Sequence, residues 1–302
     1  MNVISNKNFP DKWEYDYFVN DIMNKNLYCD DIRFLFYETE EEIDFLKIYS
    51  SEKNVLIINI ETPINNTETL IQLLNPIAVF HLSDERGKNT MYYHLYKKYS
   101  IKMVFHQYNF SNIDYGSNHL QIPLGYISTF TSGLASRSMD FKDNLDDKKY
   151  DFSFVGAIKS DRKEMLNKLS YYFKNNFIST GCTDWSHPSK QRIGPSDLHE
   201  VYKKSIFIPS GRGNVSLDCF RIYEAIIAKS IPIVVGSQKE IKCSFDFDGD
   251  KPDIVFVESW DEACKKCQNL LNSESHILNI INNNTMWWNR QLSKIIQILT
   301  NL

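Results

Sequence analysis

The stretch from Ser205 to Gly236, SIFIPSGRGNVSLDCFRIYEAIIAKSIPIVVG, limits most strongly what this chain can fold into. It predicts a strand at Ile206–Pro209, a glycine-bearing turn, a helix at Leu217–Lys229 and a second strand, which together make one βαβ unit. Parallel strands joined in this way need helices on both faces of their sheet. The stretch therefore predicts an α/β protein.

The helix predicted at Leu217–Lys229 carries one charged stripe on an otherwise apolar surface. Asp218, Arg221 and Glu224 follow one another at i, i+3 and i+6, so they span about 120° of one face. A helix enclosed in protein except for this stripe suits an anionic ligand that also bears hydroxyl groups. The alternative is a surface ladder of ion pairs along the same face.

The turn before this helix combines flexibility with positive charge. Gly211 and Gly213 flank Arg212, so the backbone can adopt φ > 0 and approach a ligand while a guanidinium projects from it. Asn214 or Ser216 can cap the helix, whose first N–H groups then favour an anion. Arg212 is our first choice for binding a diphosphate.

Two helix residues have narrower predicted roles. Glu224 lies too far into the helix to cap it, but its carboxylate can accept hydrogen bonds from vicinal hydroxyls such as those of a nucleotide ribose. Arg221 is either a phosphate ligand or the ion-pair partner of Asp218 and Glu224, and the second role is favoured slightly.

The same residues carry a resemblance to a known family. The pattern F-x-P-x-G-R-G … R-x-x-E-A-x-x-A-x-x-I-P-I-V, which begins at Phe207, resembles the signature of the exostosin-like glycosyltransferases, glycosyltransferase family 47. The segment Asp151–Arg162, DFSFVGAIKSDR, resembles the family's strand–glycine segment followed by an arginine that begins a helix. The family usually has a proline directly before the arginine of the turn, where this chain has Gly211.

Weaker similarity lies in the first half. His81–Glu85 (HLSDE) and Ile122–Tyr126 (IPLGY) resemble the ribitol xylosyltransferase branch of that family. The similarity thus covers roughly residues 80–236. It implies a GT-B fold, in which two doubly wound Rossmann-like domains face each other across a cleft, and transfer of a sugar with inversion from a UDP-sugar.

The order of predicted elements agrees with two such domains. We expect a Rossmann-like acceptor-side domain at 1–131, a linker at 132–149, a nucleotide-sugar-binding domain at 150–275, and a helix at 276–302 that packs back toward the first domain. The expected strands are Ile32–Tyr37, Val55–Ile60, Ile77–Leu82, Lys102–His106, Gln121–Pro123, Asp151–Val155, Asn176–Thr180 and Asp253–Val257, besides the two above. The expected helices are Glu68–Leu74, Thr90–Tyr99, Ser160–Asn175 with Ser160 as its cap, Ser196–Lys204 and Trp260–Leu271, besides those above.

Polar and glycine residues follow the carboxyl ends of four predicted strands. They are Gly156, the Ser210–Arg212 run, Gly236, and Asp84 with Glu85. In open α/β sheets this edge is where ligands bind. Lys159 and Arg162 stand at the start of the next helix and can add positive charge for a diphosphate, or else form a solvated first turn. The predicted donor-binding residues are Gly156, Lys159, Arg162, Ser210, Gly211, Arg212, Gly213, Arg221 and Glu224.

An inverting transfer needs a general base for the acceptor hydroxyl. In the first half, the only compact cluster of titratable residues at a strand end is HLSDE. Asp84 is the leading candidate, Glu85 the next and His81 a poor third, because His81 lies within the strand. The alternative for Asp84 and Glu85 is a capping pair before a helix.

No metal or cofactor is expected beyond the UDP-sugar substrate. No Asp-x-Asp triplet follows a predicted strand, and Asp246, Asp248 and Asp250 lack the later bidentate glutamate of a calcium loop. Cys264 and Cys267 form a lone pair without further zinc ligands, so we interpret the six cysteines as structural thiols.

The composition of the chain excludes some classes of partner and of cellular location. A net charge of −4 over 302 residues, with no basic tract, argues against a nucleic-acid partner. No apolar run approaches ~18 residues, so no transmembrane segment is expected. We expect a cytoplasmic enzyme or a soluble catalytic domain without its anchor, from a virus or an AT-rich microbe, with a glycan or glycoconjugate acceptor. The alternatives are a catalytically silent glycan- or nucleotide-binding module on the same scaffold, and an enzyme that uses another nucleotide sugar such as GDP-fucose.

Overall fold

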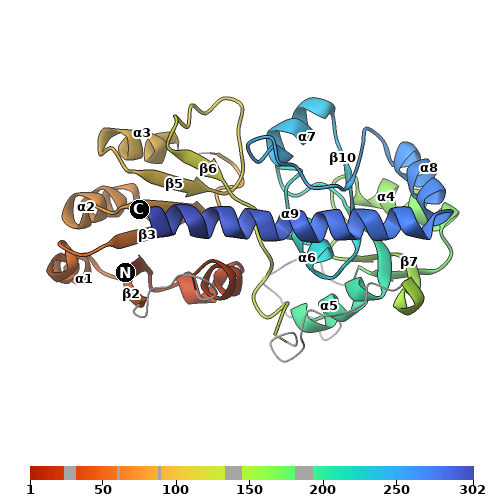
Figure 1. Ribbon diagram of the computed structural model, residues 1–302, viewed down its shortest axis with the longest axis horizontal. Coiled ribbons are helices and arrows are strands. Elements are labelled where there is room, and N and C mark those ends of the chain that lie inside the picture. The colour runs from red at the N-terminus through yellow and green to blue at the C-terminus, as the bar shows by residue number, and fades with distance from the viewer. Residues whose placement is uncertain (24–31, 60–61, 88–89, 133–144, 181–192) are drawn as a thin grey trace. The chain divides into compact units, whose positions relative to one another are not determined.

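The computed structural model describes residues 1–23, 32–59, 62–87, 90–132, 145–180 and 193–302 (Figure 1). The chain divides into two compact units. The first comprises Met1–Pro123, Phe247–Gly249 and Gln291–Leu302, and the second comprises Leu124–Asp246 and Asp250–Arg290. Each unit is built on its own parallel sheet, as the α/β prediction of two Rossmann-like domains requires.

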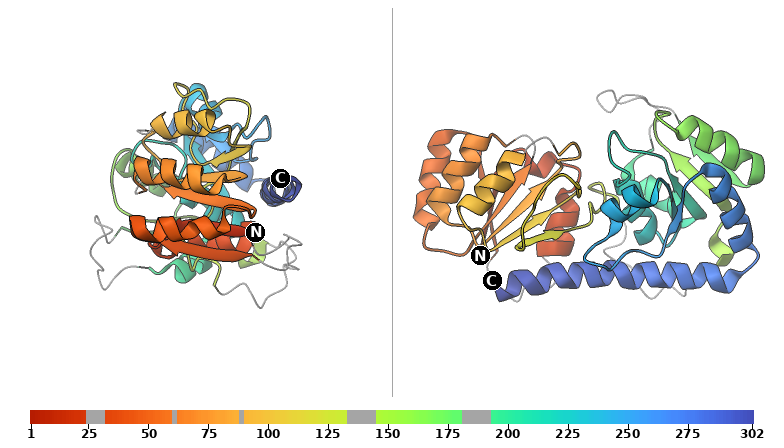
Figure 2. Two further views of the ribbon diagram at one scale, coloured as in Figure 1. Left: turned by 90° about the vertical axis from the view of Figure 1, so that its left-hand side faces the viewer. Right: turned by 90° about the horizontal axis from the view of Figure 1, so that it is seen from above.

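The first unit has a six-stranded parallel sheet in the order β2-β1-β3-β4-β5-β6. Its strands are β1 (Asn2–Asn6), β2 (Arg33–Tyr37), β3 (Asn54–Asn59), β4 (Ala78–Leu82), β5 (Met103–His106) and β6 (His119–Gln121). The helices α1 (Glu40–Phe45), α2 (Ile64–Leu74) and α3 (Thr90–Lys98) lie on one face of this sheet, with the short η3 helix (Leu46–Tyr49) after α1 (Figure 2). Their apolar residues and those of the strands form one buried cluster.

Alternation along β4 sends neighbouring side chains to opposite faces of this sheet. Phe80 faces the short helical segment η2 (Tyr17–Met23), where its ring meets Phe18 edge to face with centroids 4.9 Å apart. His81 faces α3 and lies among the rings of Tyr92, Tyr93 and Tyr96. The buried side chain of His81 therefore lies on the face of the sheet that α1, α2 and α3 cover.

The second unit has a five-stranded parallel sheet in the order β11-β10-β9-β7-β8. Its strands are β7 (Tyr150–Val155), β8 (Asn176–Ser179), β9 (Ser205–Ser210), β10 (Ile231–Val235) and β11 (Val255–Val257). Residues of α4 (Arg162–Tyr172), α8 (Trp260–Leu271) and the start of α9 (Glu274–Asn301) pack together against the sheet. The helices α5 (Pro195–Lys203) and α6 (Phe220–Ile227) contact each other and β9.

Predicted and observed domain limits differ by a few residues. The first unit gives way to the second at Pro123, before the predicted limit at residue 131, and residues 133–144 of the predicted linker lie outside the described residues. The long helix α9 begins at Glu274, and its last residues, from Gln291, are grouped with the first unit. No helix in the described ranges is long and apolar enough to cross a bilayer.

One strand and two α-helices were not predicted, and several predicted elements, such as α2 and β11, have shifted bounds. The strand β1, the helix α1 and the helix α7 (Gln238–Phe245) carry too many polar residues for their hydrophobic pattern to be evident. In β1 the side chain of Asn2 is fully buried and donates to Asn54 Oδ1 at 2.9 Å. Tertiary hydrogen bonds thus replace the apolar side chains that a strand prediction looks for.

Candidate functional site

Three of the four strand ends predicted from the sequence occur where they were expected, and β9 runs one residue further than predicted, through Ser210. Gly156 follows β7, Gly211 follows β9, Gly236 follows β10 and Asp84 lies two residues beyond β4. In the second unit the strand order reverses between β7 and β9, which makes this pair its topological switch point. Parallel α/β sheets bind ligands at the carboxyl edge of such a point.

Arg162 forms hydrogen bonds to both loops that flank the switch point. Its side chain is 6% exposed, and it donates from Nη1 to Ala157 O at 3.0 Å and from Nη2 to Arg212 O at 3.1 Å. One acceptor belongs to the loop after β7 and the other to the loop after β9. Arg162 is thus buried in the described structure and is not the solvated first-turn residue of the alternative interpretation.

Arg221 approaches the same point from α6. Its Nη2 donates to Val155 O at 3.2 Å, at the end of β7, and its guanidinium lies 5.0 Å from the ring centroid of Phe154. Arg162 lies over the same ring at 5.9 Å. Two cations therefore lie against the ring of Phe154.

In the described part of the chain, the positive charges of these two arginines are not neutralised by an ion pair. Burial and the charge of Arg221 lower the pKa of Arg162 to about 10. Burial opposes the charge of Arg221 as well, but Tyr202, Cys219 and Glu224 outweigh it and raise the pKa of that guanidinium. Within the described residues neither arginine forms an ion pair with a carboxylate. An anionic ligand would supply the missing charge.

Glycines let the backbone and these arginines come close. Gly156 has φ +150°, and a Cβ on it would lie 3.0 Å from Arg221 Nη2. Gly211 does not adopt the positive φ that the sequence suggested, and neither does Gly213. Instead, a Cβ on Gly211 would lie 2.6 Å from Arg162 Cγ. Gly211 is therefore needed for contact with the protein's own helix.

Arg212, the first choice for the diphosphate, is already paired. Its Nη2 lies 2.8 Å from Glu240 Oε1, a carboxylate that also completes the capping box of α7 with Ser237. Its backbone N–H donates to Asp161 Oδ1 at 3.0 Å. A cavity of about 260 Å³ opens beside Arg212, and polar groups of Asp161, Ser237 and other residues line it. Hydroxyl-rich groups are suited to such a lining.

Lys159 and Ser210 are the other polar donor-site candidates. Lys159 Nζ donates to Asn214 Oδ1 at 2.6 Å, which joins the loop after β7 to the loop after β9 on their exposed side. Ser210 is buried and lies 2.9 Å from Cys219 Sγ. Gly156, Lys159, Arg162, Gly211, Arg212 and Arg221 thus all contact the loops or strand ends at the switch point.

Glu224 is a buried carboxylate with a single hydrogen bond in the described structure. Its side chain is 2% exposed, and Oε1 accepts from the N–H of Ile127 at 3.3 Å. Burial raises the pKa of Glu224 to about 7, although the nearby charge of Arg221 opposes this. Because this pKa lies close to neutral pH, the carboxyl group of Glu224 can form hydrogen bonds with hydroxyl groups at little electrostatic cost.

Three local predictions about these helices were wrong. The helix α6 begins at Phe220 with Cys219 as its N-cap, so Asp218 lies before the helix and is no part of a helical stripe. Ser216 does not cap α6; its Oγ accepts from the N–H of Asp218 at 3.0 Å, which forms a tight turn before the helix. Ser160 has φ +55° and cannot be the N-cap of α4, whose N-cap is Asp161.

The surface ladder of ion pairs is likewise not what the structure contains. Asp218 and Glu224 are almost fully buried, and no ion pair joins Arg221 to either of them among the described residues. The two carboxylates therefore lie inside the second unit, and Arg221 is half-buried. Their burial costs free energy that an exposed ladder would avoid.

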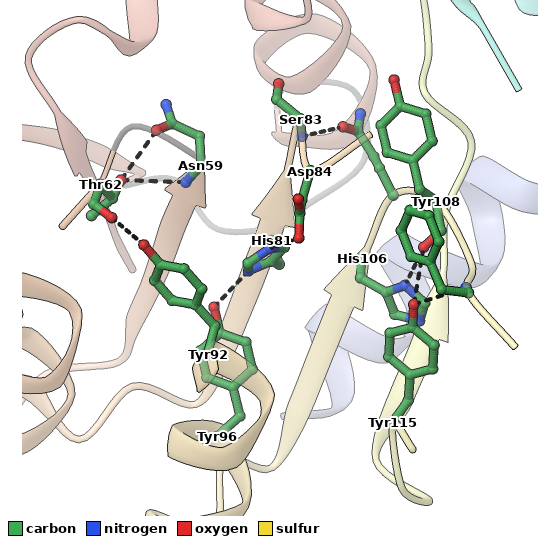
Figure 3. A network of polar contacts seen from close by, with 12 residues as sticks. Asn59, Thr62, His81, Ser83, Asp84, Tyr92, Tyr96, His106, Tyr108 and Tyr115 are labelled. Carbon is green, nitrogen blue, oxygen red and sulfur yellow. Dashed lines mark hydrogen bonds and ion pairs between the residues drawn. The ribbon is translucent and has the colours of Figure 1, made fainter. Parts of the chain in front are cut away.

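In the first unit, polar residues gather at the ends of β3, β4 and β5 (Figure 3). Ser83, with φ +63°, turns the chain after β4, and its N–H donates to Gln107 Oε1 at 2.8 Å. Its hydroxyl also donates to Glu14. The turn brings Asp84 Oδ2 to 3.6 Å from Nε2 of His81. Asp84 is 2% exposed, whereas Glu85 is half-buried.

No group of three or more potential metal ligands occurs in the described ranges. Asp248 pairs with Lys294 at 2.6 Å and Asp250 with Arg290 at 2.9 Å, in agreement with a connector that bears charges. Burial raises the pKa of the Cys264 thiol to about 11 and that of Cys267 further still. Cys29 and Cys182 lie outside the described residues.

Sequence reasoning missed three residues of this site. Asp161 accepts from Arg212 N–H and, through Oδ2, from Trp260 Nε1 at 3.1 Å, so it joins the loop after β9 to α8. Cys219 and Tyr202 lie beside Arg221. Asp161 follows Ser160 directly, so a better choice of helix cap would have found it. Nothing in the sequence indicates Tyr202.

One solved structure agrees with this architecture. No protein-family model matches the chain, and no curated protein matches it. Among solved structures, it is similar to Anabaena Alr3699/HepE in complex with UDP, with a TM-score of 0.55 and 8% identity over 99% of this chain and 98% of that one. A glycotransferase of kitacinnamycin gives a TM-score of 0.43 and 8% identity, over 89% and 86% of the chains. The fold is α/β with two Rossmann-like domains, as predicted for GT-B proteins.

Proposed function

We propose that this protein is a glycosyltransferase that takes a sugar from a UDP-sugar and transfers it to a hydroxyl of a glycan or glycoconjugate. The observation that carries the proposal is the switch point of the second unit. Arg162 and Arg221 lie there without ion-pair partners in the described structure, next to the nearly buried carboxylate of Glu224. A nucleoside diphosphate supplies both the negative charge and the vicinal hydroxyls that this arrangement lacks.

The donor would be bound in two parts. Its diphosphate lies at the loops after β7 and β9, where Arg221, Arg162 and Lys159 contribute positive charge, and Arg212 can share its guanidinium between Glu240 and the ligand. Its ribose hydroxyls donate to Glu224. The fold shared with Anabaena Alr3699/HepE, which was solved with UDP, supports the choice of a uridine nucleotide.

The reaction we propose is an inverting displacement that needs no metal ion. The acceptor hydroxyl gives its proton to a carboxylate, for which Asp84 is the leading candidate and Glu85 the second. The acceptor oxygen forms a bond to the anomeric carbon, the bond from that carbon to the diphosphate breaks, and its electron pair leaves with UDP. Fixed cations and backbone N–H groups neutralise the leaving group.

The finer assignment to the exostosin-like family, closest to its ribitol xylosyltransferase branch, is also part of the proposal. It is supported by the residues of the βαβ unit and by the HLSDE segment. A screen of UDP-hexoses and UDP-pentoses as donors would show which kind of sugar is transferred.

Calorimetry with UDP, GDP and CMP, followed by assays of UDP-sugar hydrolysis, tests this function. We expect UDP to bind most tightly and Glu224→Ala to abolish hydrolysis. Tight UDP binding with no hydrolysis or transfer from any UDP-sugar would instead identify a silent nucleotide-binding module. Preference for GDP would identify a GDP-sugar enzyme such as a GDP-fucose transferase. Asp84→Asn should lower turnover and leave UDP affinity nearly unchanged.

A further inference from the structure

His81 is a buried titratable residue that lies beside Asp84, the proposed base. It lies on β4 with 1% of its surface exposed, and its ring contacts those of Tyr92, Tyr93 and Tyr96. Its two nitrogens have different partners, as Figure 3 shows. Nδ1 lies 2.9 Å from the hydroxyl of Tyr96, and Nε2 lies 3.6 Å from Asp84 Oδ2.

The tautomer of His81 that we infer has Tyr96 as the donor to Nδ1. Tyr96 is fully buried, and burial keeps the pKa of its phenol well above 10, so the hydroxyl remains protonated. A phenol that donates to Nδ1 leaves the hydrogen of a neutral imidazole on Nε2. That N–H then points toward the carboxylate of Asp84.

The backbone after β4 holds Asp84 in place from the other side. Ser83 adopts the left-handed conformation at φ +63°, which a non-glycine residue accepts only under constraint. Its N–H and hydroxyl are both engaged, with Gln107 and Glu14 respectively. Asp84 is therefore located by a turn anchored to β5 as well as by the ring of His81.

We propose that His81 is a positioning residue for Asp84. Its Nε2–H, oriented by Tyr96, holds the carboxylate in the rotamer from which it accepts the proton of the sugar acceptor. The inference rests on the proposed function, because it takes Asp84 as the base. A separation of 3.6 Å is long for a hydrogen bond, and catalytic hydrogen bonds commonly shorten when substrate is bound.

Two variants of His81 separate positioning from packing. His81→Gln keeps an N–H near the position of Nε2, and His81→Leu removes it. We expect His81→Leu to lower kcat by about 10-fold or more while KM for donor and acceptor changes by less than about twofold, and His81→Gln to recover most of the loss. Equal kcat for wild type and His81→Leu, or equal impairment of both variants, would overturn the proposal.

His106→Leu is the matched control. His106 is also buried, and its Nδ1 bonds the carbonyl of Tyr108, away from Asp84. We expect this variant to lose thermal stability but to keep kcat below its melting temperature. A loss of kcat equal to that of His81→Leu would show that damage to the buried cluster is sufficient, and the proposal would fail.

The dependence on Asp84 is tested by combining variants. In an Asp84→Asn background, His81→Leu should lower kcat no further, because the carboxylate it positions is gone. A further loss of about 10-fold would mean that His81 acts on another group, such as Glu85.

A measurement without turnover distinguishes failure of this inference from failure of the proposed function. Nitrogen-15 NMR of the imidazole in the whole protein should find the His81 hydrogen on Nε2, and Asp84→Asn should shift that resonance. A hydrogen on Nδ1 would overturn the inference even in an active enzyme. Absence of UDP binding in the wild type would instead overturn the proposed function and the catalytic part of the inference with it.

Discussion

The carboxyl edges of the two sheets use buried polar groups in opposite ways. In the first unit several of these groups pair with neutral neighbours: Asn59 with Thr62, Ser83 with Gln107, and His106 with the carbonyl of Tyr108. In the second unit Arg162 and Arg221 donate to backbone carbonyls but form no ion pair in the described ranges.

This difference indicates which of the two sheet edges gains more from binding a charged ligand. A buried polar group that is hydrogen-bonded costs little, whereas a buried charge without a counter-charge is costly. The first edge makes many of its hydrogen bonds among its own residues, although Nε2 of His81 makes none in the described structure. The second edge is electrostatically incomplete and gains most from an anion. The comparison predicts which substitutions affect binding and which affect stability.

The largest effect is expected from Arg221. Arg221→Met removes one of the two clustered cations and should weaken UDP binding by about 100-fold, since hydrogen bonds between charged groups contribute roughly 1.5–3 kcal/mol. Binding of uridine should change little. Calorimetry with both ligands checks this, with Arg290→Met, at an exposed ion pair with Asp250, as the control. Equal losses for UDP and uridine would end the assignment of a diphosphate site.

The first unit should respond to acid through His106. Burial lowers the pKa of His106 from its ordinary value to about 3. The unfolded chain gains a proton near pH 6.5 and the folded chain does not, so stability present above that pH is lost as pH falls toward 3. By pH 5 this loss is about 2 kcal/mol.

Urea unfolding of the wild type and of His106→Phe at pH 8 and pH 5 measures that loss. The phenyl ring can keep the stacking of His106 on Tyr115, whose centroids lie 4.1 Å apart. The variant should lose about 2 kcal/mol less than the wild type between the two pH values. The same pH dependence in both proteins would contradict the burial of a neutral imidazole.

The second unit should show the opposite sign through Glu224. Its pKa is raised to about 7, so its contribution to stability is full at pH below 4.5 and is lost as pH rises through 7. Glu224→Gln cannot ionise and should raise the unfolding free energy at pH 8 on the order of 1 kcal/mol or more, with the gain vanishing below pH 4.5. The same change should weaken UDP binding. Loss of stability at pH 8 would show that the carboxylate is needed by the fold.

The smallest effects are expected at the bridge between the two loops. Lys159 must release Asn214 to reach a diphosphate, because its Nζ donates to that amide oxygen. Asn214→Ala should therefore raise UDP affinity by about twofold to threefold, and Lys159→Met should lower it by a similar factor, as exposed polar pairs contribute ~0.2–1 kcal/mol. Changes of the same sign in both variants would mean that the bridge helps to form the site.

Much of the second unit could be predicted from the sequence because its signals are local. The apolar strands β9 and β10 and the glycine turn between them lie within one stretch, and the strand ends placed Gly156 and Gly211 correctly. Local reasoning failed at the start of helices. Ser160 has the composition of a cap, but the turn before α4 gives it a positive φ and leaves Asp161 at the N-cap.

The remaining features depend on contacts between distant residues. The pairing of Arg212 with Glu240, the bond from Ile127 to Glu224, and the burial of Asn2 in β1 join positions that no short pattern relates. Gly211 illustrates the same limit. The sequence explains it by backbone freedom, whereas the structure explains it by the nearness of Arg162.

A crystal structure of the protein with UDP tests the central claim most directly. We predict density for the nucleotide at the switch point between β7 and β9, with the diphosphate contacting Arg221 or Arg162 and the ribose hydroxyls bound by Glu224. UDP bound elsewhere, or both arginines and Glu224 directed away from the nucleotide, would contradict the account.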